Sequence, residues 1–330
     1  MSAILEAFNL TKKFGNFEAV KGVSFAVEEG EVFGLLGPNG AGKTTTISML
    51  TTVLKPTSGT ARIGGYDILQ EPMKVKETIG LVPQDLALYP TLSARTNLNF
   101  FGSIYGLRGK ELADRVDDVL DVVALTDRQK DAVEKFSGGM KRRVNIAAGL
   151  VHHPRLLFLD EPTVGVDPQS RNHIFESVLK LNRERGMSII YTSHYMEEVE
   201  LLCSRVAIVD QGVIIAMDTV KNLINMLGGG VIHVGLRQFN PTLLGEIAGL
   251  GAVKSAIMLP AAADGKEAAP AGEAAEVVTM VKVEALQSQE ALVNLIRYIN
   301  DKDLAIASME ILEPNLESVF LHLTGKKLRE

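Results

Sequence analysis

The apolar positions of the first 225 or so residues fall into short continuous runs that alternate with stretches of helical periodicity. Residues 31–36 (EVFGLL), 155–160 (RLLFLD) and 188–193 (SIIYTS) are such runs, and a helical stretch follows each of them. Central strands of a parallel sheet are covered on both faces, so a continuous apolar run is the pattern they show. The sequence therefore predicts an α/β domain with a central, mainly parallel sheet.

Strand patterns are absent from about residue 93 to residue 151. Apolar residues recur there at the spacing of one helix face, as at Leu112, Val116, Val119, Leu120 and Val123. We therefore expect a helical subdomain, over about residues 86–151, inserted into the first domain.

Three glycines at residues 228–230 separate this region from a second pattern. Glycine offers little resistance to a change of chain direction, so a boundary is expected there. Strand and helix patterns then follow in the order β-α-β-β-α-β, with one more helix over 316–323. This order is that of the split βαβ motif and predicts a small α+β domain.

The expected domains are therefore residues 1–227 and residues 228–330. Within the second domain, residues 260–276 consist mainly of Ala, Gly, Pro and Glu and include no large apolar residue. Such a segment has too little apolar surface to form a packed core. We expect a flexible loop over about residues 260–276.

Composition and charge are those of an ordinary globular protein. Of the 330 residues, 46% are hydrophobic and 22% are charged, which excludes a disordered or collagen-like chain. The net charge is −6, whereas proteins that bind nucleic acids by releasing counterions are normally positive. The N-terminal residues lack a signal-peptide pattern, no apolar run could cross a bilayer, and Cys203 is the only cysteine. We therefore expect a cytoplasmic protein that does not bind nucleic acid.

Residues 37–44 (GPNGAGKT) match the motif G-x-x-x-x-G-K-[ST] between a predicted strand and a predicted helix. The glycines let backbone N–H groups approach a phosphate, and the start of the helix adds a partial positive charge. Lys43 would contact the β- and γ-phosphates, and Thr44 would offer its hydroxyl to Mg²⁺. The alternative is a glycine-rich turn that caps a helix, and roughly 1% of chains this long would match by chance. Phosphate binding is therefore assigned to Gly37, Pro38, Asn39, Gly40, Ala41, Gly42, Lys43, Thr44 and Thr45.

Two carboxylates, Asp160 and Glu161, end the apolar strand pattern of residues 156–161 (LLFLDE). Ligands of α/β sheets bind at this carboxyl edge. We expect Asp160 to orient Mg²⁺ and Glu161 to polarise the attacking water as a general base. Two acids at a strand end are by themselves more often a helix cap or a solvated turn, and it is the phosphate loop that favours the catalytic interpretation.

Two further polar residues follow predicted strands. His194 follows the strand of residues 188–193, where its ring could reach a γ-phosphate, and none of the other five histidines has such a position. Gln84 follows the strand of residues 79–82, and its amide oxygen suits Mg²⁺ or the attacking water. We expect both side chains to belong to the catalytic site.

A second anion-binding pattern opens the helix that runs to about residue 151. A serine at an N-cap followed by two glycines exposes backbone N–H groups at the start of a helix. These residues are Ser137, Gly138 and Gly139. The alternative is an ordinary capped helix whose basic residues, Lys141, Arg142 and Arg143, form a solvated face.

In this order along the chain, the phosphate loop, Gln84, FSGGM (136–140), LLFLDE (156–161), VGVD (164–167) and His194 resemble the ATP-binding subunit of an ABC transporter. The resemblance covers about residues 3–225. It implies an N-terminal antiparallel β subdomain beside the central sheet and the helical insertion. It also implies that ATP and Mg²⁺ are the cofactors.

The resemblance further implies that two copies of the chain close head to tail. Ser137, Gly138 and Gly139 of one copy would then hold the γ-phosphate bound to Lys43 of the other. It implies that Phe14 stacks on adenine and that Asp167 contributes to nucleotide binding. The sequence departs from the usual family pattern at Phe14, Phe136 and Met140, where Tyr, Leu and Gln are commoner, and we expect hydrolysis to survive these changes.

Residues 315–325 (NLESVFLHLTG) resemble the end of the daunorubicin-resistance branch of drug and antibiotic exporters, in which a separate polypeptide carries the membrane helices. The chain is thus expected to be a homodimeric ATPase on the cytoplasmic face of the membrane that drives a separate permease. The alternative is a non-transport ATPase of the same type, acting as a regulatory or nucleic-acid-associated switch. The second domain could sense a small molecule or stabilise the dimer.

Overall fold

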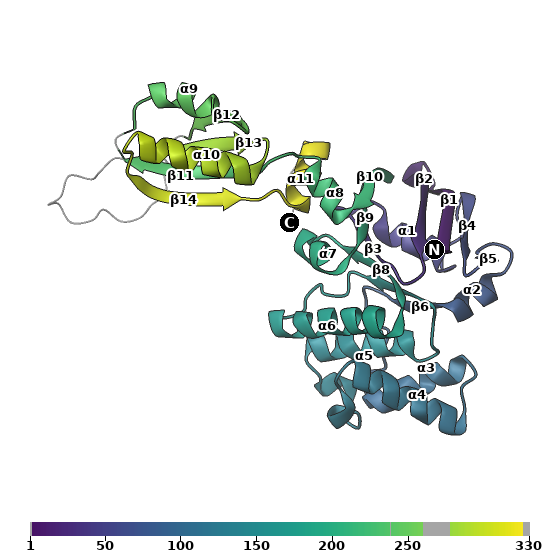
Figure 1. The fold of residues 1–330 in the computed structure, drawn as a ribbon. Coiled ribbons are helices and arrows are strands. Elements are labelled where there is room, and N and C mark those ends of the chain that lie inside the picture. Colours follow the sequence, from purple (N-terminus) through teal and green to yellow (C-terminus); the bar gives the residue numbers. More distant parts are fainter. Residues whose placement is uncertain (1, 238, 260–277, 326–330) are drawn as a thin grey trace. The chain divides into compact units, whose positions relative to one another are not determined.

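The computed structural model describes residues 2–237, 239–259 and 278–325 (Figure 1). The chain divides into two compact units between Val220 and Lys221. The expected flexible loop over residues 260–276 lies outside the described residues. No helix in the described ranges is both long and apolar enough to cross a membrane.

The central sheet of the first unit has six strands in the order β10-β9-β3-β8-β7-β6. All neighbouring strands are parallel except β10, which pairs antiparallel with β9. Every residue of β3, β7 and β8 is buried, which confirms the prediction of a mainly parallel sheet with covered central strands. The strands are β3 (Val32–Leu36), β6 (Ile79–Val82), β7 (Leu156–Asp160), β8 (Ser188–Ser193), β9 (Arg205–Asp210) and β10 (Val213–Thr219).

A second, antiparallel sheet has the order β2-β1-β4-β5. Its buried residues share one hydrophobic core with the central sheet and with helix α1 (Lys43–Leu50), and this core includes Leu5, Val20, Phe33, Ile47 and Phe158. Both sheets also approach the phosphate loop, because a Cβ at Gly42 would meet Ala19 of β2 and a Cβ at Gly37 would meet Val209 of β9. The strands are β1 (Ala3–Phe14), β2 (Phe17–Glu28), β4 (Ser58–Ile63) and β5 (Tyr66–Asp67).

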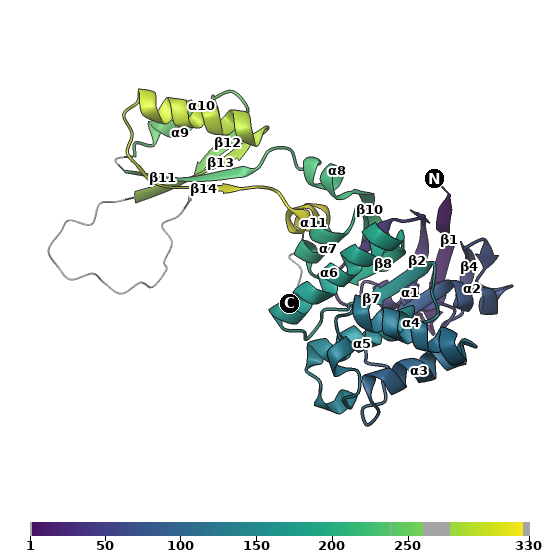
Figure 2. The ribbon, with the colours of Figure 1, turned by 60° about the horizontal axis from the view of Figure 1, so that its bottom comes forward.

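Helices α3, α4, α5 and α6 gather on one side of the first unit, and Figures 1 and 2 show the same grouping. Helices α3, α4 and α5, with two 3₁₀ turns between α4 and α5, make up the expected helical insertion. The helices of this unit are α2 (Pro72–Thr78), α3 (Ala94–Ile104), α4 (Gly109–Val122), α5 (Gly138–Leu150), α6 (Pro168–Arg185) and α7 (Met196–Leu202), and the 3₁₀ turns are Thr126–Arg128 and Val133–Lys135.

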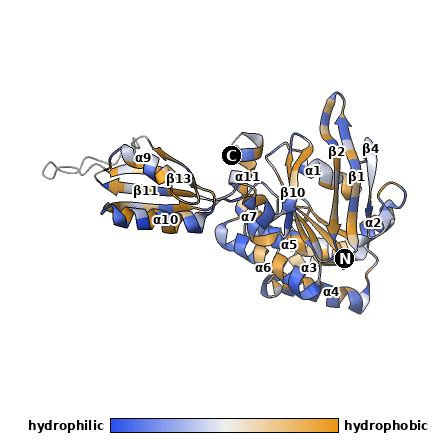
Figure 3. Cartoon of the chain, turned by 45° about the horizontal axis from the view of Figure 1, so that its top comes forward, coloured by the Kyte–Doolittle hydropathy of each residue, from blue (hydrophilic) through white to orange (hydrophobic). Residues whose placement is uncertain are grey.

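The second unit contains a four-stranded antiparallel sheet in the order β12-β13-β11-β14. Its elements follow the predicted β-α-β-β-α-β sequence, which confirms the split βαβ arrangement. Residues of α9 and α10 pack on the buried face of this sheet, and in Figure 3 orange hydrophobic residues are frequent in the strands while blue residues are frequent on α10. The elements are β11 (Val231–Arg237), α9 (Thr242–Ala248), β12 (Val253–Met258), β13 (Val278–Ala285), α10 (Ser288–Asp301), β14 (Ile306–Leu312) and α11 (Leu316–Thr324), and α8 (Val220–Asn225) precedes them.

Candidate nucleotide-binding site

A pocket of about 460 Å³ lies at the phosphate loop of the first unit. Its lining joins residues from the antiparallel sheet, the phosphate loop, the segment after β6 and the end of β7. These residues are Phe14, Phe17, Ala19, Asn39, Gly40, Gly42, Lys43, Thr44, Thr45, Gln84 and Glu161. Residues of four separate sequence motifs thus meet in one place.

The backbone of the phosphate loop requires glycine at two positions. Gly42 has a φ of 103°, and a Cβ there would lie 2.7 Å from the carbonyl oxygen of Ala19. A Cβ at Gly37 would lie 2.2 Å from the carbonyl oxygen of Val209. Helix α1 follows directly and has no side-chain cap, so its first N–H groups are available to an anion.

Lys43, Glu161 and His194 form a continuous set of polar contacts. The Lys43 side chain is 4% exposed, and its Nζ donates to the carbonyl oxygen of Gly37 at 2.7 Å. The same Nζ lies 3.0 Å from Oε1 of Glu161. The other carboxylate oxygen of Glu161 lies 3.2 Å from Nδ1 of His194. The predicted base therefore contacts both the predicted phosphate-binding cation and the predicted histidine.

The backbone of Glu161 has a φ of 46°, in the left-handed region. For a residue other than glycine such a conformation costs roughly 1–2 kcal/mol. The Glu161 N–H donates to Oγ1 of Thr192 at 2.8 Å, which holds the turn at the end of β7. Thr192 lies inside an apolar strand and was not predicted as a site residue, because nothing in the local sequence distinguishes it.

Asp160 and Thr44 offer oxygen atoms suited to Mg²⁺. Oγ1 of Thr44 donates to Oδ1 of Asp160 at 3.3 Å, and Oγ1 of Thr192 donates to the same oxygen at 2.8 Å. Burial raises the pKa of Asp160, and the two hydrogen bonds oppose that shift. Mg²⁺ takes one or two carboxylates together with phosphate oxygens and waters. The described residues contain no group of three or more His, Cys, Asp or Glu side chains that could hold a metal, so a site here would be of that phosphate-assisted kind.

The serine-glycine motif does not line the pocket of its own chain. Oγ of Ser137 accepts from the N–H of Met140 at 3.2 Å and caps α5. A Cβ at Gly139 would lie 2.1 Å from the side chain of Ser170, whereas at Gly138 the nearest atom would be 3.8 Å away. The helix start is therefore packed on one side and open on the other.

Asp167 lies beside this helix start and caps α6. Its Oδ1 accepts from the N–H of Ser170 at 2.9 Å, and this hydrogen bond lowers the pKa of Asp167. A Cβ at Gly139 would lie 3.4 Å from Oδ2 of Asp167. The structure thus gathers the predicted nucleotide contacts into two clusters, one at the pocket and one at the start of α5.

The interpretation of Arg142 and Arg143 as a solvated basic face is wrong. The two residues are only 4% and 9% exposed, and burial lowers the pKa of both guanidinium groups. Arg143 donates to the carbonyl oxygen of Val123 at 2.8 Å. Arg142 donates to backbone carbonyls of the pocket segments. Both arginines are internal parts of the unit.

Glu198 is a further buried acid that the sequence did not indicate. It is 2% exposed, and its Oε2 accepts from Thr163 at 2.8 Å, Tyr191 at 2.9 Å and Ser193 at 2.9 Å. Burial, and then the neighbouring carboxylate, raises the pKa of Tyr191 well above its usual value. One carboxylate oxygen therefore connects the loop after β7 to β8, the strand that precedes His194.

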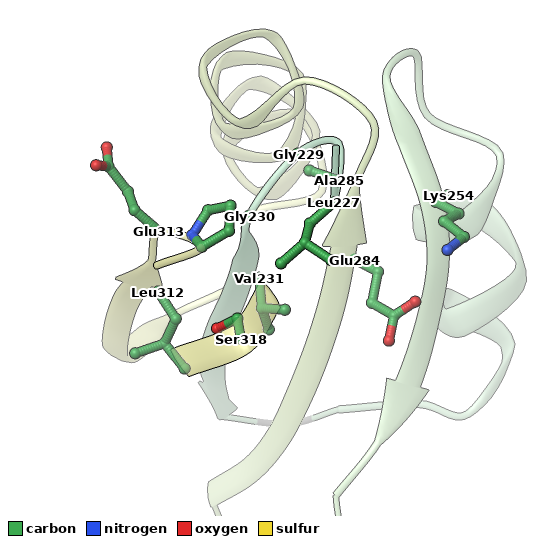
Figure 4. A pocket seen from close by; sticks show the side chains of 11 residues that line it. Leu227, Gly229, Gly230, Val231, Lys254, Glu284, Ala285, Leu312, Glu313 and Ser318 are labelled. Atoms are coloured by element: carbon green, nitrogen blue, oxygen red, sulfur yellow. The ribbon is translucent and has the colours of Figure 1, made fainter. Parts of the chain in front are cut away.

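The second unit has a pocket of its own, of about 310 Å³ (Figure 4). Figure 4 shows Lys254 and Glu284 on neighbouring strands, with Leu227, Val231 and Leu312 among the apolar residues of the lining. Glu284 forms an ion pair at 2.8 Å with Lys282, which does not line the pocket. The lining contains no buried charged side chain, unlike that of the pocket at the phosphate loop.

Three comparisons with known proteins agree with this geometry. The family model described as ABC transporter matches residues 20–164. The linearmycin resistance ATP-binding protein LnrL of Bacillus subtilis (strain 168) is 46% identical over 328 residues, which is 99% of this chain and 100% of that protein. The daunorubicin resistance ATP-binding protein DrrA2 of Streptomyces coeruleorubidus is 37% identical over 318 residues, 96% of this chain and 94% of that protein.

Among solved structures, a dimeric post-hydrolysis state of the ATP-binding cassette MJ0796, bound to ADP and Pi, superposes with a TM-score of 0.60 at 27% identity. The match covers 65% of this chain and 98% of that cassette. The similar part is thus about the size of a whole cassette.

Proposed function

Because the chain belongs to the ABC transporter family of ATP-binding proteins and is an ATPase of that family, we propose that two copies share their ATP sites and drive a separate membrane permease. The observation that carries the hydrolytic part of this proposal is the placement of Glu161. It contacts Lys43 of the phosphate loop at 3.0 Å and His194 at 3.2 Å. A base held between a phosphate-binding cation and a histidine is placed for phosphoryl chemistry.

The residues in and beside the pocket have different roles in hydrolysis. Lys43 and the N–H groups of the loop bind the phosphates, and Glu161 accepts a hydrogen bond from the attacking water and polarises it. Thr44, Asp160 and Gln84 would hold Mg²⁺, which neutralises phosphate charge when it is bound. His194 orients Glu161 and can donate to the γ-phosphate. A phosphate at Lys43 would compete with Glu161 for the ammonium group, which would free the carboxylate for water.

The second cluster supports the sharing of sites between two copies. The open side of Gly138 and the N–H groups at the start of α5 that Ser137 does not cap can bind an anion, but no residue of that cluster lines the pocket of the same chain. In a head-to-tail dimer, Ser137, Gly138 and Gly139 would complete the pocket of the partner. The same arrangement would bring Asp167 to that interface.

An exposed aromatic surface supports a membrane partner. Several large apolar side chains after Gln84 and on α3 are exposed by between 37% and 64%, namely Leu86, Tyr89, Leu92, Phe100 and Ile104. The rings of Tyr89 and Phe100 pack edge to face with centroids 5.0 Å apart. Exposed apolar side chains that pack together, as those of Tyr89 and Phe100 do, mark an interaction site. We propose that the permease docks here, on the cytoplasmic face of the membrane.

The names of two relatives indicate which class of substrate to propose for transport. These relatives are named for resistance to linearmycin and to daunorubicin. We propose export of a drug or antibiotic. Copurification from membranes tests the partner: a membrane protein recovered with the full chain supports this function, and recovery of ribosomes or DNA instead contradicts it.

Mixing two inactive variants tests the shared site. Lys43→Ala removes the phosphate-binding cation, and Ser137→Arg blocks the start of α5, so each variant alone should lack ATP turnover. In a mixed dimer one site receives Lys43 and Ser137 from different chains and is intact. An equimolar mixture should regain measurable turnover, up to roughly a quarter of the wild-type value if the two sites act independently and less if each depends on the other. A mixture as inactive as its components contradicts site sharing.

A further inference from the structure

Arg142 lies one turn inside α5, the helix that begins with the serine-glycine motif. Its guanidinium donates to the carbonyl oxygens of Pro83 at 2.8 Å and Gln84 at 2.7 Å, and more weakly to that of Glu161 at 3.4 Å. One side chain therefore contacts the backbone of both pocket segments, the one that carries Gln84 and the one that carries Glu161.

A second side chain of α5 holds the same segment. Asn145, which is 2% exposed, accepts from the N–H of Ala87 at 3.1 Å and approaches the carbonyl oxygen of Pro83 at 3.5 Å. Asn145 is three residues after Arg142, so the two side chains project from one face of the helix. Side chains of α5 thus fasten residues 83–87 to the helix.

Burial of the Arg142 guanidinium carries an unfavourable desolvation free energy, so a functional reason for its position is expected. The side chain is 4% exposed, and no ion pair of Arg142 is found within the described ranges. Its charge interacts at longer range with Asp160 and Asp85. A buried cation satisfied by backbone carbonyls contributes less to stability than a well-packed apolar residue could. Its geometry, a planar fork that reaches two neighbouring carbonyls, is what an apolar residue cannot supply.

We propose that Arg142 is a positioning residue that couples the two ATP sites of the dimer. When Ser137, Gly138 and Gly139 bind the partner's nucleotide, α5 becomes fixed, and Arg142 carries that position to Gln84 and Glu161 of its own site. Binding at one site thereby prepares the base of the other. This inference rests on the proposed sharing of sites between two copies.

The test compares three variants of the full chain by ATP turnover against ATP concentration. Arg142→Gln removes the fork, and Arg142→Lys keeps the charge without the fork. Arg108→Gln is the matched control, because Arg108 also donates to two carbonyls, of Ser103 and Leu107, both at 2.7 Å, but on the exposed surface. ATP-driven dimerisation is measured separately for each variant in a Glu161→Gln background, by light scattering.

Arg142→Gln should lower kcat about 10-fold, an effect within the usual range of allosteric coupling. It should also lower the Hill coefficient for ATP to about 1. The ATP concentration for half dimerisation should change less than about 3-fold, because the binding residues are intact. Arg142→Lys should resemble Arg142→Gln, and Arg108→Gln should behave as wild type. If Arg142→Gln does not fold, Arg142→Lys answers the same question.

A variant at Arg142 with the wild-type kcat and Hill coefficient overturns the proposal. So does a parallel loss of kcat, dimerisation and thermal stability, because that result describes a purely structural residue. If the Glu161→Gln chain with Arg142 intact forms no ATP-dependent dimer, the proposed sharing of sites is itself wrong. This last outcome is recognised before any variant at Arg142 is measured, so the two failures are distinguishable.

Discussion

The interiors of the two units differ in what they bury. The first unit encloses charged side chains at 2–5% exposure, among them Lys43, Arg142, Asp160, Glu161 and Glu198. In the described part of the second unit the buried residues of the core are apolar, as are Ile232, Val283 and Leu295. Burying charge is unfavourable unless it is fully paired. The difference indicates that buried residues of the first unit serve catalysis and ligand binding, whereas those of the second unit serve packing.

Charged pairs of the second unit lie at its surface instead. Lys282 pairs with Glu284 at 2.8 Å with side chains 28% and 35% exposed. The Lys302–Glu246 pair, at 2.6 Å, is more exposed, with side chains at 45% and 46%. Pairs of this kind contribute about 0–1 kcal/mol to stability. Charged residues are therefore expected to affect ATP turnover in the first unit more than in the second. Substitutions in both units can measure this difference.

The largest difference is expected for a lysine. Lys43→Ala removes the cation that contacts Glu161, and ATP turnover should fall by about 10³-fold or more because phosphate charge is no longer neutralised. Lys282→Ala is the matched change in the second unit and should leave turnover within about 2-fold, since a surface pair contributes little. A phosphate-release assay on both variants checks this. Equal losses in the two variants would contradict the comparison.

A core substitution in the second unit should affect stability without affecting chemistry. Leu295 is fully buried in α10, and Leu295→Ala should destabilise this unit by about 2–5 kcal/mol. Because its core is separate from that of the first unit, turnover below the unfolding temperature should stay within about 2-fold. Calorimetry and the turnover assay test both statements. A loss of turnover in step with stability would show that the two units function as one.

The smallest effect is expected at the aromatic residues of the pocket. Phe14 and Phe17 line the pocket and are 50% and 65% exposed. Phe17→Ala should raise the KM for ATP about 3- to 10-fold with kcat unchanged, because a lost aromatic contact costs about 0.5–1.5 kcal/mol. Phe8→Ala removes another exposed ring, that of a β1 residue outside the pocket that is 46% exposed, and serves as the control. An unchanged KM in Phe17→Ala would exclude stacking at this position.

The sequence predicted those features that lie within a few residues of one another. Buried strands appear as apolar runs, and the phosphate loop has fixed residues at fixed spacing, so β3 and the loop over 37–44 were readily predicted. Phe17 could not be predicted, because an exposed aromatic next to a turn has many explanations. Its place in the pocket depends on how the antiparallel sheet packs beside the phosphate loop.

Burial of the internal charges was equally hidden from the sequence. Arg142 and Arg143 follow a glycine motif and look like a solvated basic face, yet their partners are carbonyl groups about 20 to 60 residues away in the chain. Glu198 lies among other acids of α7, and only its contacts with Thr163 and Ser193 distinguish it. Such roles depend on tertiary contacts, which a local sequence pattern does not reveal.

The central claim is that Glu161 carries out hydrolysis at a site that ATP closes between two chains. The most direct measurement uses Glu161→Gln, in which the amide keeps the size of the side chain but cannot act as a base. Turnover should fall by about 10²-fold or more, while ATP with Mg²⁺ should convert the protein to a stable dimer in light scattering. Wild-type turnover by Glu161→Gln, or a chain that stays monomeric with saturating ATP, would contradict the account.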